Sequence, residues 1–402
     1  MKNLIICGVL SFLCLAAIAA VEPLDNCRLV FEREKKGTVA FLGGSITENT
    51  GGHVNRLMGR LRKRFPECQF TCVAAGVAST CSDTGAFRFG RDVLSKGRVD
   101  LLFVEFAVND DQDGHFTREH ALRGMEGVVR QARAANPLMD IVMIHFVNGN
   151  EIAQLLKGET PIPYDAHSAV AAHYGIPVAN VGAELAQRTK AGTWRFGGGT
   201  EAGITYYGGE HPNPPGYDLA AELAWKALEG GWNPSVTTSA PHKLPAKLDP
   251  ASYDAGRFIP LESAKLGAGW QISLPDWTAI AGSKRGQYCK DPILWSDVPG
   301  SEFKLSFTGT AVGAFVTSFM SDAGALEVSV DGGPFAVRRL LSQWSYCLHY
   351  PRTVILAEGL KDGPHEVVVR LVEDHKDAFE REQPNRAGGK VARIHALCVN
   401  GR

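Results

Sequence analysis

Early in the chain, the sequence reads Thr38-Val39-Ala40-Phe41-Leu42-Gly43-Gly44-Ser45-Ile46-Thr47. The apolar run over 38–42 is typical of a buried strand, and the glycine pair predicts that this strand ends in a sharp turn. A helical pattern soon follows, with apolar residues at Val54, Leu57, Met58, Leu61 and Phe65. Ser45 therefore lies between a strand and a helix, at the edge where open α/β sheets bind their ligands.

The alternation of strand and helix continues as far as about Trp232. Further strands are predicted over 70–75, 100–106, 140–144 and 176–181, and helices over 120–135, 165–173 and 217–228. Strands that alternate with helices at this spacing predict a parallel sheet covered by helices on both faces. The sequence thus indicates an α/β domain over 21–232 with a five-stranded sheet.

The character of the sequence changes after Trp232. The stretch 233–250 is rich in proline, serine and threonine and predicts a linker. Beyond it, short runs of alternating hydrophobicity are separated by turn residues; they lie at 302–307, 311–319, 325–330, 353–357 and 365–372. This pattern predicts a second, all-β domain over 251–402, most simply a sandwich.

The first twenty residues predict export. Lys2 is followed by an apolar run over 4–16 and by the small residues Ala17-Ile18-Ala19, a pattern typical of a signal peptide cleaved near Ala19 or Ala20. The run is short for a membrane anchor, which is the alternative interpretation. We expect a secreted or periplasmic protein without a membrane span after cleavage. The net charge of −1 argues against nucleic-acid binding through bulk charge.

Two of the nine cysteines, Cys7 and Cys14, lie in the predicted signal peptide, so seven remain. An odd number leaves at least one thiol unpaired. Either one disulfide forms among Cys68, Cys72 and Cys81, or these residues act as small buried hydrophobes. The spacing of cysteines and histidines does not resemble a zinc site, and we expect no metal or other cofactor.

Three more polar or turn residues follow predicted strands. Gly76 follows the second strand, Asn109 follows the third, and His211 lies between the last strand and the final helix. Because the carboxyl ends of parallel strands meet at one edge of the sheet, these residues are expected to lie near Ser45. A serine with a nearby base can act as a nucleophile, and amide N–H groups can stabilise an oxyanion.

The order Ser, Gly, Asn, His resembles the SGNH hydrolase superfamily of GDSL-type esterases. The segment 103–110 is similar to that of a glycan-directed subgroup, and the β-rich tail resembles the jelly-roll module that some members carry. This resemblance implies a flavodoxin-like sheet in the first domain, with Ser45 as nucleophile and His211 as base. It also implies that the oxyanion is bound by the backbone N–H groups of Ser45 and Gly76 and by the Asn109 side chain.

The sequence departs from this family at one position. The family usually has an aspartate three residues before the histidine, where it orients the imidazole, and here that position is Gly208. Glu210 is a poor substitute because adjacent side chains diverge, and Glu201 lies in a glycine-rich stretch. We therefore expect a Ser45–His211 dyad, with a backbone carbonyl orienting the ring.

Several residues near these motifs are candidates for substrate binding. Asp110 begins an acidic cluster with Asp111 and Asp113 that either shapes a sugar site or forms a solvated loop. Trp194, Tyr206, Tyr207 and Glu210 surround His211 in sequence. The aromatic rings among them either stack on sugar rings or pack the loop. Glu105 interrupts an apolar strand, which favours a buried, paired role over a catalytic one.

The predicted function is removal of acetyl or other small acyl groups from an oligosaccharide or polysaccharide. The alternatives are an esterase that acts on small lipid or aryl esters and a non-catalytic glycan-binding protein built on a decayed hydrolase. The presence of both Ser45 and His211 argues against decay, whereas Gly208 keeps that alternative open.

Overall fold

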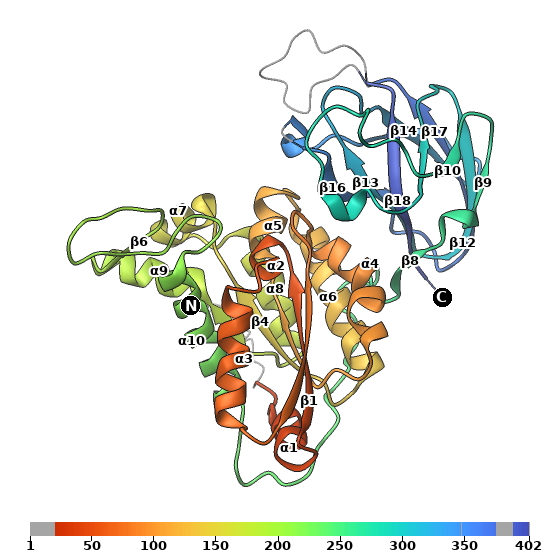
Figure 1. Ribbon diagram of the computed structural model, residues 1–402. Helices are drawn as coiled ribbons and strands as arrows, with labels where there is room; N and C mark the ends of the chain where they lie inside the picture. Colours follow the sequence, from red (N-terminus) through yellow and green to blue (C-terminus); the bar gives the residue numbers. More distant parts are fainter. Residues whose placement is uncertain (1–20, 347, 375–388, 402) are drawn as a thin grey trace, which may run out of the picture.

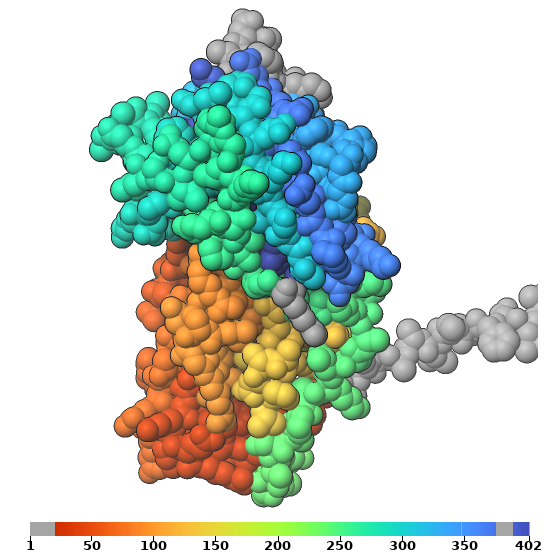
Figure 2. All heavy atoms as spheres, turned by 90° about the vertical axis from the view of Figure 1, so that its right-hand side faces the viewer, coloured from red at the N-terminus to blue at the C-terminus, as the bar shows by residue number. Residues whose placement is uncertain are grey.

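The computed structural model describes residues 21–346, 348–374 and 389–401, so the predicted signal peptide lies outside the described residues. Figure 1 shows an α/β domain below and a β-sandwich above it, and the side view in Figure 2 shows the two parts in direct contact. No helix of the described ranges has the length and apolar character that crossing a membrane would require.

The α/β domain is built on a five-stranded parallel sheet of order β2-β1-β3-β4-β5. Its strands are β1 (Lys36–Gly43), β2 (Gln69–Gly76), β3 (Leu101–Val104), β4 (Asp140–His145) and β5 (Val178–Asn180). The chain moves from β1 to one neighbour, β2, and then returns to the other, β3. This order is flavodoxin-like and creates a crevice at the carboxyl ends of β1 and β3. The predicted parallel five-stranded sheet is confirmed.

Helices cover both faces of this sheet. Val39 and Phe41 of β1 face one core, and Ala40 and Leu42 face the other. The first core is covered by α1 (Asp25–Arg33), α3 (His53–Arg64), α7 (Gly149–Lys157), α9 (Val181–Lys190) and α10 (Pro214–Gly230), and the second by α4 (Ser82–Asp92), α6 (Arg118–Ala135) and α8 (Ile162–His173). Two short helices, α2 (Ser45–Glu48) and α5 (Ala107–Gln112), follow β1 and β3.

The β-sandwich, from β8 to β18, consists of two antiparallel sheets. One has the order β10-β11-β18-β13-β16, with β8 also paired to β18, and the other has the order β15-β14-β17-β12-β9. Their strands are β8 (Gly256–Ile259), β9 (Ala264–Leu266), β10 (Gln271–Ser273), β11 (Ile293–Ser296), β12 (Glu302–Gly309), β13 (Ala311–Ser318), β14 (Ala325–Val330), β15 (Ala336–Arg339), β16 (Tyr350–Ala357), β17 (Gly363–Val372) and β18 (Ala392–Asn400). Leu305, Val316 and Leu371 lie in the core between the sheets. The predicted all-β second domain is confirmed.

The two domains share a hydrophobic contact. Phe87 of α4 lies in the same apolar cluster as Phe315 and Cys398 of the β-sandwich. Figure 1 shows α2 and α5, which mark the carboxyl ends of β1 and β3, on the side of the sheet that faces the β-sandwich. The crevice of the parallel sheet therefore opens toward the second domain.

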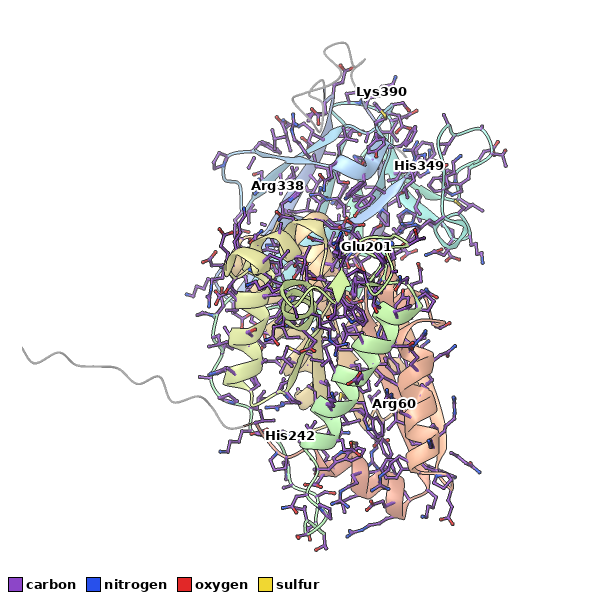
Figure 3. All side chains as sticks on the ribbon, turned by 90° about the vertical axis from the view of Figure 1, so that its left-hand side faces the viewer. Arg60, Glu201, His242, Arg338, His349 and Lys390 are labelled. Atoms are coloured by element: carbon purple, nitrogen blue, oxygen red, sulfur yellow. The ribbon has the colours of Figure 1, made fainter. Side chains whose placement is uncertain are left out.

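The segment 233–255, here called the strap, connects the domains along the side of the α/β domain. It contains no helix or strand, and all its residues are described. Arg28 donates to the Val236 carbonyl at 2.7 Å, and His242 lies between Glu22 and Asp140 at 2.8 and 2.7 Å. Figure 3 shows His242 at the end of the domain opposite Glu201. The predicted linker is thus bound to the surface it crosses.

The cysteines of the described ranges are all free. They are Cys27, Cys68, Cys72, Cys81, Cys289 and Cys398. The disulfide considered among Cys68, Cys72 and Cys81 does not form. The alternative of small buried hydrophobes is correct for Cys68 and Cys81 and wrong for Cys72, which is exposed. Cys347 lies outside the described residues.

Candidate active site

Ser45 and His211 meet at the carboxyl end of the sheet. Ser45 is the first residue of α2, directly after β1, and its hydroxyl lies 2.7 Å from Nε2 of His211. Because a hydroxyl can donate a proton to a neutral imidazole at this distance, the pair has the geometry of a nucleophile and its general base. The other ring nitrogen, Nδ1, makes no hydrogen bond to the described residues.

Glu105 fixes the turn that carries Ser45. Its side chain is 1% exposed, and Oε1 accepts hydrogen bonds from the Gly44 N–H at 2.9 Å and the Thr47 hydroxyl at 2.6 Å. Burial raises the pKa of Glu105 to about 7, although these two hydrogen bonds act in the opposite direction. A Cβ atom on Gly43 would lie 2.0 Å from Glu105 Oε1, so the close approach requires glycine.

Arg88 of α4 binds the ends of β1 and β2 together. The side chain is 1% exposed, and it donates to the carbonyls of Gly43 at 2.9 Å and Ala75 at 2.7 Å. Gly76 comes next, and a Cβ there would lie 2.1 Å from the backbone nitrogen of Glu48. Glycine at this position lets the end of β2 pack directly against α2.

Asn109 lies beside the nucleophile turn, on α5. It is 2% exposed, and its Nδ2 donates to Oδ2 of Asp113 at 2.5 Å. A Cβ on Gly44 would lie 2.1 Å from Asn109 Oδ1, which places the amide against the backbone that precedes Ser45. An asparagine amide has two N–H donors, so the bond to Asp113 leaves one for a substrate oxygen.

A glycine-rich loop supports His211. The Asn213 N–H donates to the Tyr207 carbonyl at 2.9 Å, and the Asn213 side chain caps α10 by accepting from the Gly216 N–H at 3.0 Å. Gly208 has a φ of +95°, and a Cβ there would lie 2.5 Å from the Asn213 nitrogen. Glycine is therefore required at the position where the family has aspartate, because the loop turns too tightly for any side chain.

Neither glutamate considered as a substitute orients His211. Glu210 is exposed and makes no hydrogen bond within the described ranges. Glu201 pairs with Arg195 at 3.0 Å, and both of these side chains are about half exposed. The expected backbone carbonyl is not found either, because Nδ1 makes no hydrogen bond to the described residues, so Ser45 is the hydrogen-bond partner of the ring among them.

The predicted substrate contacts are only partly compatible with the structure. Asp110 is fully buried; it accepts from Ser82 at 2.8 and 2.6 Å and lies 3.0 Å from His167. Tyr207 is also fully buried and stacks on Phe196, with ring centroids 6.0 Å apart. Contacts of Asp110 and Tyr207 with a substrate do not fit these positions. Their side chains were assigned to the surface because turn sequences usually lie there.

Trp194 and Glu210 lie nearer the surface. Trp194 is half-buried on β6 (Trp194–Arg195), which pairs with β7 (Thr205–Tyr206), and its ring contacts Arg188. Glu210 Oε1 lies 3.8 Å from the position a Cβ would take on Gly149, at the start of α7. Of these two, Glu210 is the one that lies next to His211 and close to the start of α7.

Three residues of the site were not predicted: Arg88, Asn148 and Asn150. Asp111 and Asp113 were considered only as members of an acidic cluster. In the structure Asp113 accepts from Asn109, and the Asp111 carboxylate accepts from Asn148 at 2.9 Å and from Asn150 at 3.1 Å and forms a polar rim with them. The two asparagines in 148–150, after a buried strand, were the available signal. Within the described ranges, no three His, Cys, Asp or Glu side chains form a group that could hold a metal ion.

Comparison with known proteins finds similarity to one family and to solved two-domain esterases. Residues 41–219 match the model of the GDSL-like lipase/acylhydrolase family. A solved two-domain esterase (CEX), active on acetylated mannans and co-crystallized with mannopentaose, is 22% identical with a TM-score of 0.68, over 95% of this chain and 96% of that one. A second structure of a two-domain esterase active on acetylated mannans is 21% identical with a TM-score of 0.69, and the match again covers 95% of this chain and 96% of that one. At this identity the likeness shows a common fold. No curated protein matches the chain.

Proposed function

The chain carries a GDSL-like lipase/acylhydrolase domain of the SGNH superfamily over residues 41–219, and on this premise we propose that it is a secreted serine esterase that removes acetyl groups from carbohydrate. The observation that carries the proposal is the 2.7 Å contact between the Ser45 hydroxyl and His211 Nε2, at the carboxyl end of the parallel sheet. Carboxylic ester hydrolysis is the chemistry of this domain.

In the proposed mechanism, the Ser45 oxygen attacks the carbonyl carbon of the ester while His211 Nε2 takes the hydroxyl proton. The carbon–oxygen bond to the sugar then breaks, and His211 returns the proton to the leaving hydroxyl. Water, activated by the same nitrogen, attacks the acetyl–Ser45 ester and releases acetate. The reaction needs no metal or cofactor, because Ser45 supplies the nucleophile and His211 moves each proton.

The negative charge that develops on the carbonyl oxygen must be stabilised by hydrogen-bond donors. We assign this role to the backbone N–H groups of Ser45 and Gly76 and to the second N–H of Asn109. This assignment is supported by the close packing of Gly44, Gly76 and Asn109 around the turn that carries Ser45. Removing one such donor typically lowers kcat about a hundredfold or more.

A carbohydrate substrate is supported by the surroundings of the dyad. The rim beside Glu210 is polar, because Asp111, Asn148 and Asn150 supply carboxylate and amide groups that can bind sugar hydroxyls. A two-domain esterase of the same architecture acts on acetylated mannans. The proposed leaving group is therefore a sugar hydroxyl of an acetylated oligosaccharide or polysaccharide.

The test is to measure acetate release by the purified protein from acetylated mannan, from acetylated xylan and from para-nitrophenyl acetate, with Ser45→Ala as the control. We expect release from at least one polysaccharide and none from the Ser45→Ala variant. Release from the aryl ester alone would favour the small-ester alternative. Binding of polysaccharide without any release would support the non-catalytic alternative.

Export rests on the sequence over 1–20. N-terminal sequencing of the protein recovered outside the cytoplasm should give a chain that begins near Val21. Recovery only inside the cell, with Met1 retained, would contradict secretion.

A further inference from the structure

The β-sandwich contacts the loops that carry the proposed oxyanion donors. Arg285 donates to the Ala78 carbonyl at 2.8 Å and to the Ser79 hydroxyl at 2.9 Å, shortly after Gly76. Ser79 has a φ of +68°, a conformation that a serine adopts only when its surroundings hold it there. The loop after β2 is therefore strained and is held from the second domain.

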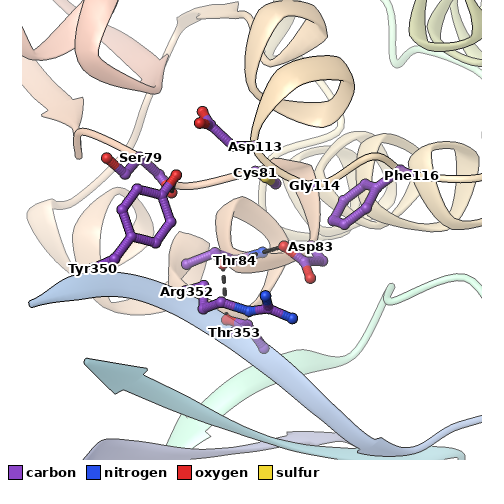
Figure 4. Close-up of a pocket in the computed structure, with 10 residues that line it drawn as sticks. All are labelled: Ser79, Cys81, Asp83, Thr84, Asp113, Gly114, Phe116, Tyr350, Arg352 and Thr353. Atoms are coloured by element: carbon purple, nitrogen blue, oxygen red, sulfur yellow. Dashed lines mark hydrogen bonds between the residues drawn. The ribbon is translucent and has the colours of Figure 1, made fainter. Parts of the chain in front are cut away.

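Two further contacts from the β-sandwich hold the loop after β2 and the end of α5. The Tyr350 hydroxyl, on β16, donates to the Ser79 carbonyl at 3.4 Å. Tyr350 is only 3% exposed. Gln343 of the β-sandwich also donates to the Gln112 carbonyl, at the end of α5. Figure 4 shows Tyr350 and Asp113 facing the same small pocket from the two domains, with Ser79 beside them.

Asp113 in turn selects the orientation of the Asn109 amide. An amide side chain can turn either its oxygen or its nitrogen toward a neighbour, because its terminal torsion is broad. A carboxylate accepts hydrogen bonds only, so Asp113 binds Nδ2 and repels Oδ1. The remaining Nδ2–H is then available to a substrate oxygen. Burial raises the pKa of Asp113, and the hydrogen bond from Asn109 opposes that rise and favours the carboxylate.

We propose that the β-sandwich completes the oxyanion site: Arg285 and Tyr350 hold the loop after Gly76, and Gln343 holds the end of α5, where Asp113 orients the Asn109 amide. Tyr350, Asp113 and Arg285 are positioning residues, since they act through Asn109 and Gly76. This inference rests on the proposed function and deepens it. It predicts that the second domain contributes to turnover even for a substrate that carries no sugar.

The experiment measures kcat and KM with para-nitrophenyl acetate for the full chain, for Tyr350→Phe, for Asn109→Ala and for the double variant. Phenylalanine keeps the ring and removes only the hydroxyl. We expect Tyr350→Phe to lower kcat about tenfold with little change in KM, because misplacing a catalytic group costs rate rather than binding. In the Asn109→Ala background the same change should lower kcat by a similar factor, because Tyr350 holds the loop after Gly76 and does not contact Asn109.

Tyr253→Phe is the matched control. Tyr253 is fully buried on the strap, and its hydroxyl donates to Glu358 of the β-sandwich at 2.6 Å, so it loses a comparable interdomain hydrogen bond away from the loop after Gly76. It should lower Tm and leave kcat unchanged. An unchanged kcat in Tyr350→Phe, or a loss that disappears in the Asn109→Ala background, would overturn the inference. Failure of the proposed function is distinguishable, because then Ser45→Ala would retain the activity of the unmodified chain.

Discussion

Ser45 and His211 touch each other, yet the segments that hold them differ in almost every respect. The nucleophile turn follows a buried central strand, and two side chains that are each 1% exposed, Glu105 and Arg88, bind its backbone. His211 lies on an exposed, glycine-rich loop, and its ring makes one hydrogen bond, to Ser45. The nucleophile is thus positioned by the core, whereas the base is positioned by a turn.

This difference explains why the dyad lacks a third member. A buried turn can accommodate a carboxylate such as Glu105, because backbone and hydroxyl donors satisfy it. The tight turn at Gly208 leaves no volume for a side chain, so the loop carries no carboxylate at that position. The turn that carries Ser45 and the loop that carries His211 can each be tested by a substitution.

The largest effect is expected from His211→Ala. Without a base at 2.7 Å, the Ser45 hydroxyl keeps its proton, and kcat should fall about a thousandfold or more. Because members of a catalytic pair act as a unit, the variants His211→Ala, Ser45→Ala and the double variant should retain the same residual rate. Stopped assays of acetate release would measure it. A further loss in the double variant would show that the two residues act independently.

Gly208→Asp introduces the aspartate found in the family. We expect a loss of about tenfold or more in kcat, not a gain, because the new Cβ lies 2.5 Å from the Asn213 nitrogen and its φ of +95° is unfavourable. Gly209→Asp is the control, since a Cβ there meets nothing within 4 Å. It adds the same charge to the same loop and should leave kcat near that of the unmodified chain. Higher activity in Gly208→Asp would mean that the loop readily remodels.

Glu105→Gln tests the buried turn that carries Ser45, through the pH dependence of the protein's stability. The pKa of Glu105 is about 7 in the folded protein and near its ordinary value of 4.5 when unfolded. Between these values the folded state holds the extra proton, so stability falls as pH rises through this interval. Because glutamine cannot titrate, the variant does not lose stability over this pH interval. The Tm of the variant relative to the unmodified chain should therefore be higher at about pH 8 than at about pH 5.

Glu119→Gln, an exposed position on α6, serves as the control for this measurement. Its effect on Tm should be the same at both pH values. A Glu105→Gln variant whose relative Tm was also independent of pH would contradict the raised pKa.

Glu210→Ala should have the smallest effect. Its carboxylate makes no hydrogen bond with the described residues, so kcat with para-nitrophenyl acetate should stay within about twofold and its pH profile should not shift. A shift of the basic limb would instead assign Glu210 to the orientation of His211. An increase in KM confined to polysaccharide would place it in the sugar-binding rim.

The sequence predicted the five strands and four of the large helices because their buried faces have regular periods. It missed α1, α4, α7 and α9. Most of α4, from Ser82 to Phe89, is buried, because the helix lies between the parallel sheet and the β-sandwich. The strap covers the polar residues of α1 in the same way. The burial of polar side chains such as Asp83 and Arg88 depends on partners from other segments, which a local pattern does not encode.

The positions of Ser45, Gly76 and Asn109 could be predicted because parallel strands bring their carboxyl ends to one edge. The burial of Asp110 and Tyr207 could not, because it depends on partners such as Ser82 and Phe196. The hydrogen bond from Tyr350 to the Ser79 carbonyl joins two domains, and no local pattern in the sequence encodes it.

The strap also decides how short the α/β domain can be made. Glu126 accepts from the Leu248 N–H at 2.7 Å, and Asp140 accepts from His242; both acids are fully buried. A chain truncated after Trp232 would lose these hydrogen bonds, at about 1–3 kcal/mol each, although Glu126 would keep the Tyr174 hydroxyl and Asp140 the Cys27 N–H. Tyr253 fills the gap beside Phe87, with ring centroids 5.0 Å apart. We therefore expect the α/β domain to need the strap through Tyr253, and a fragment cut where the sequence changes character to have a lower Tm.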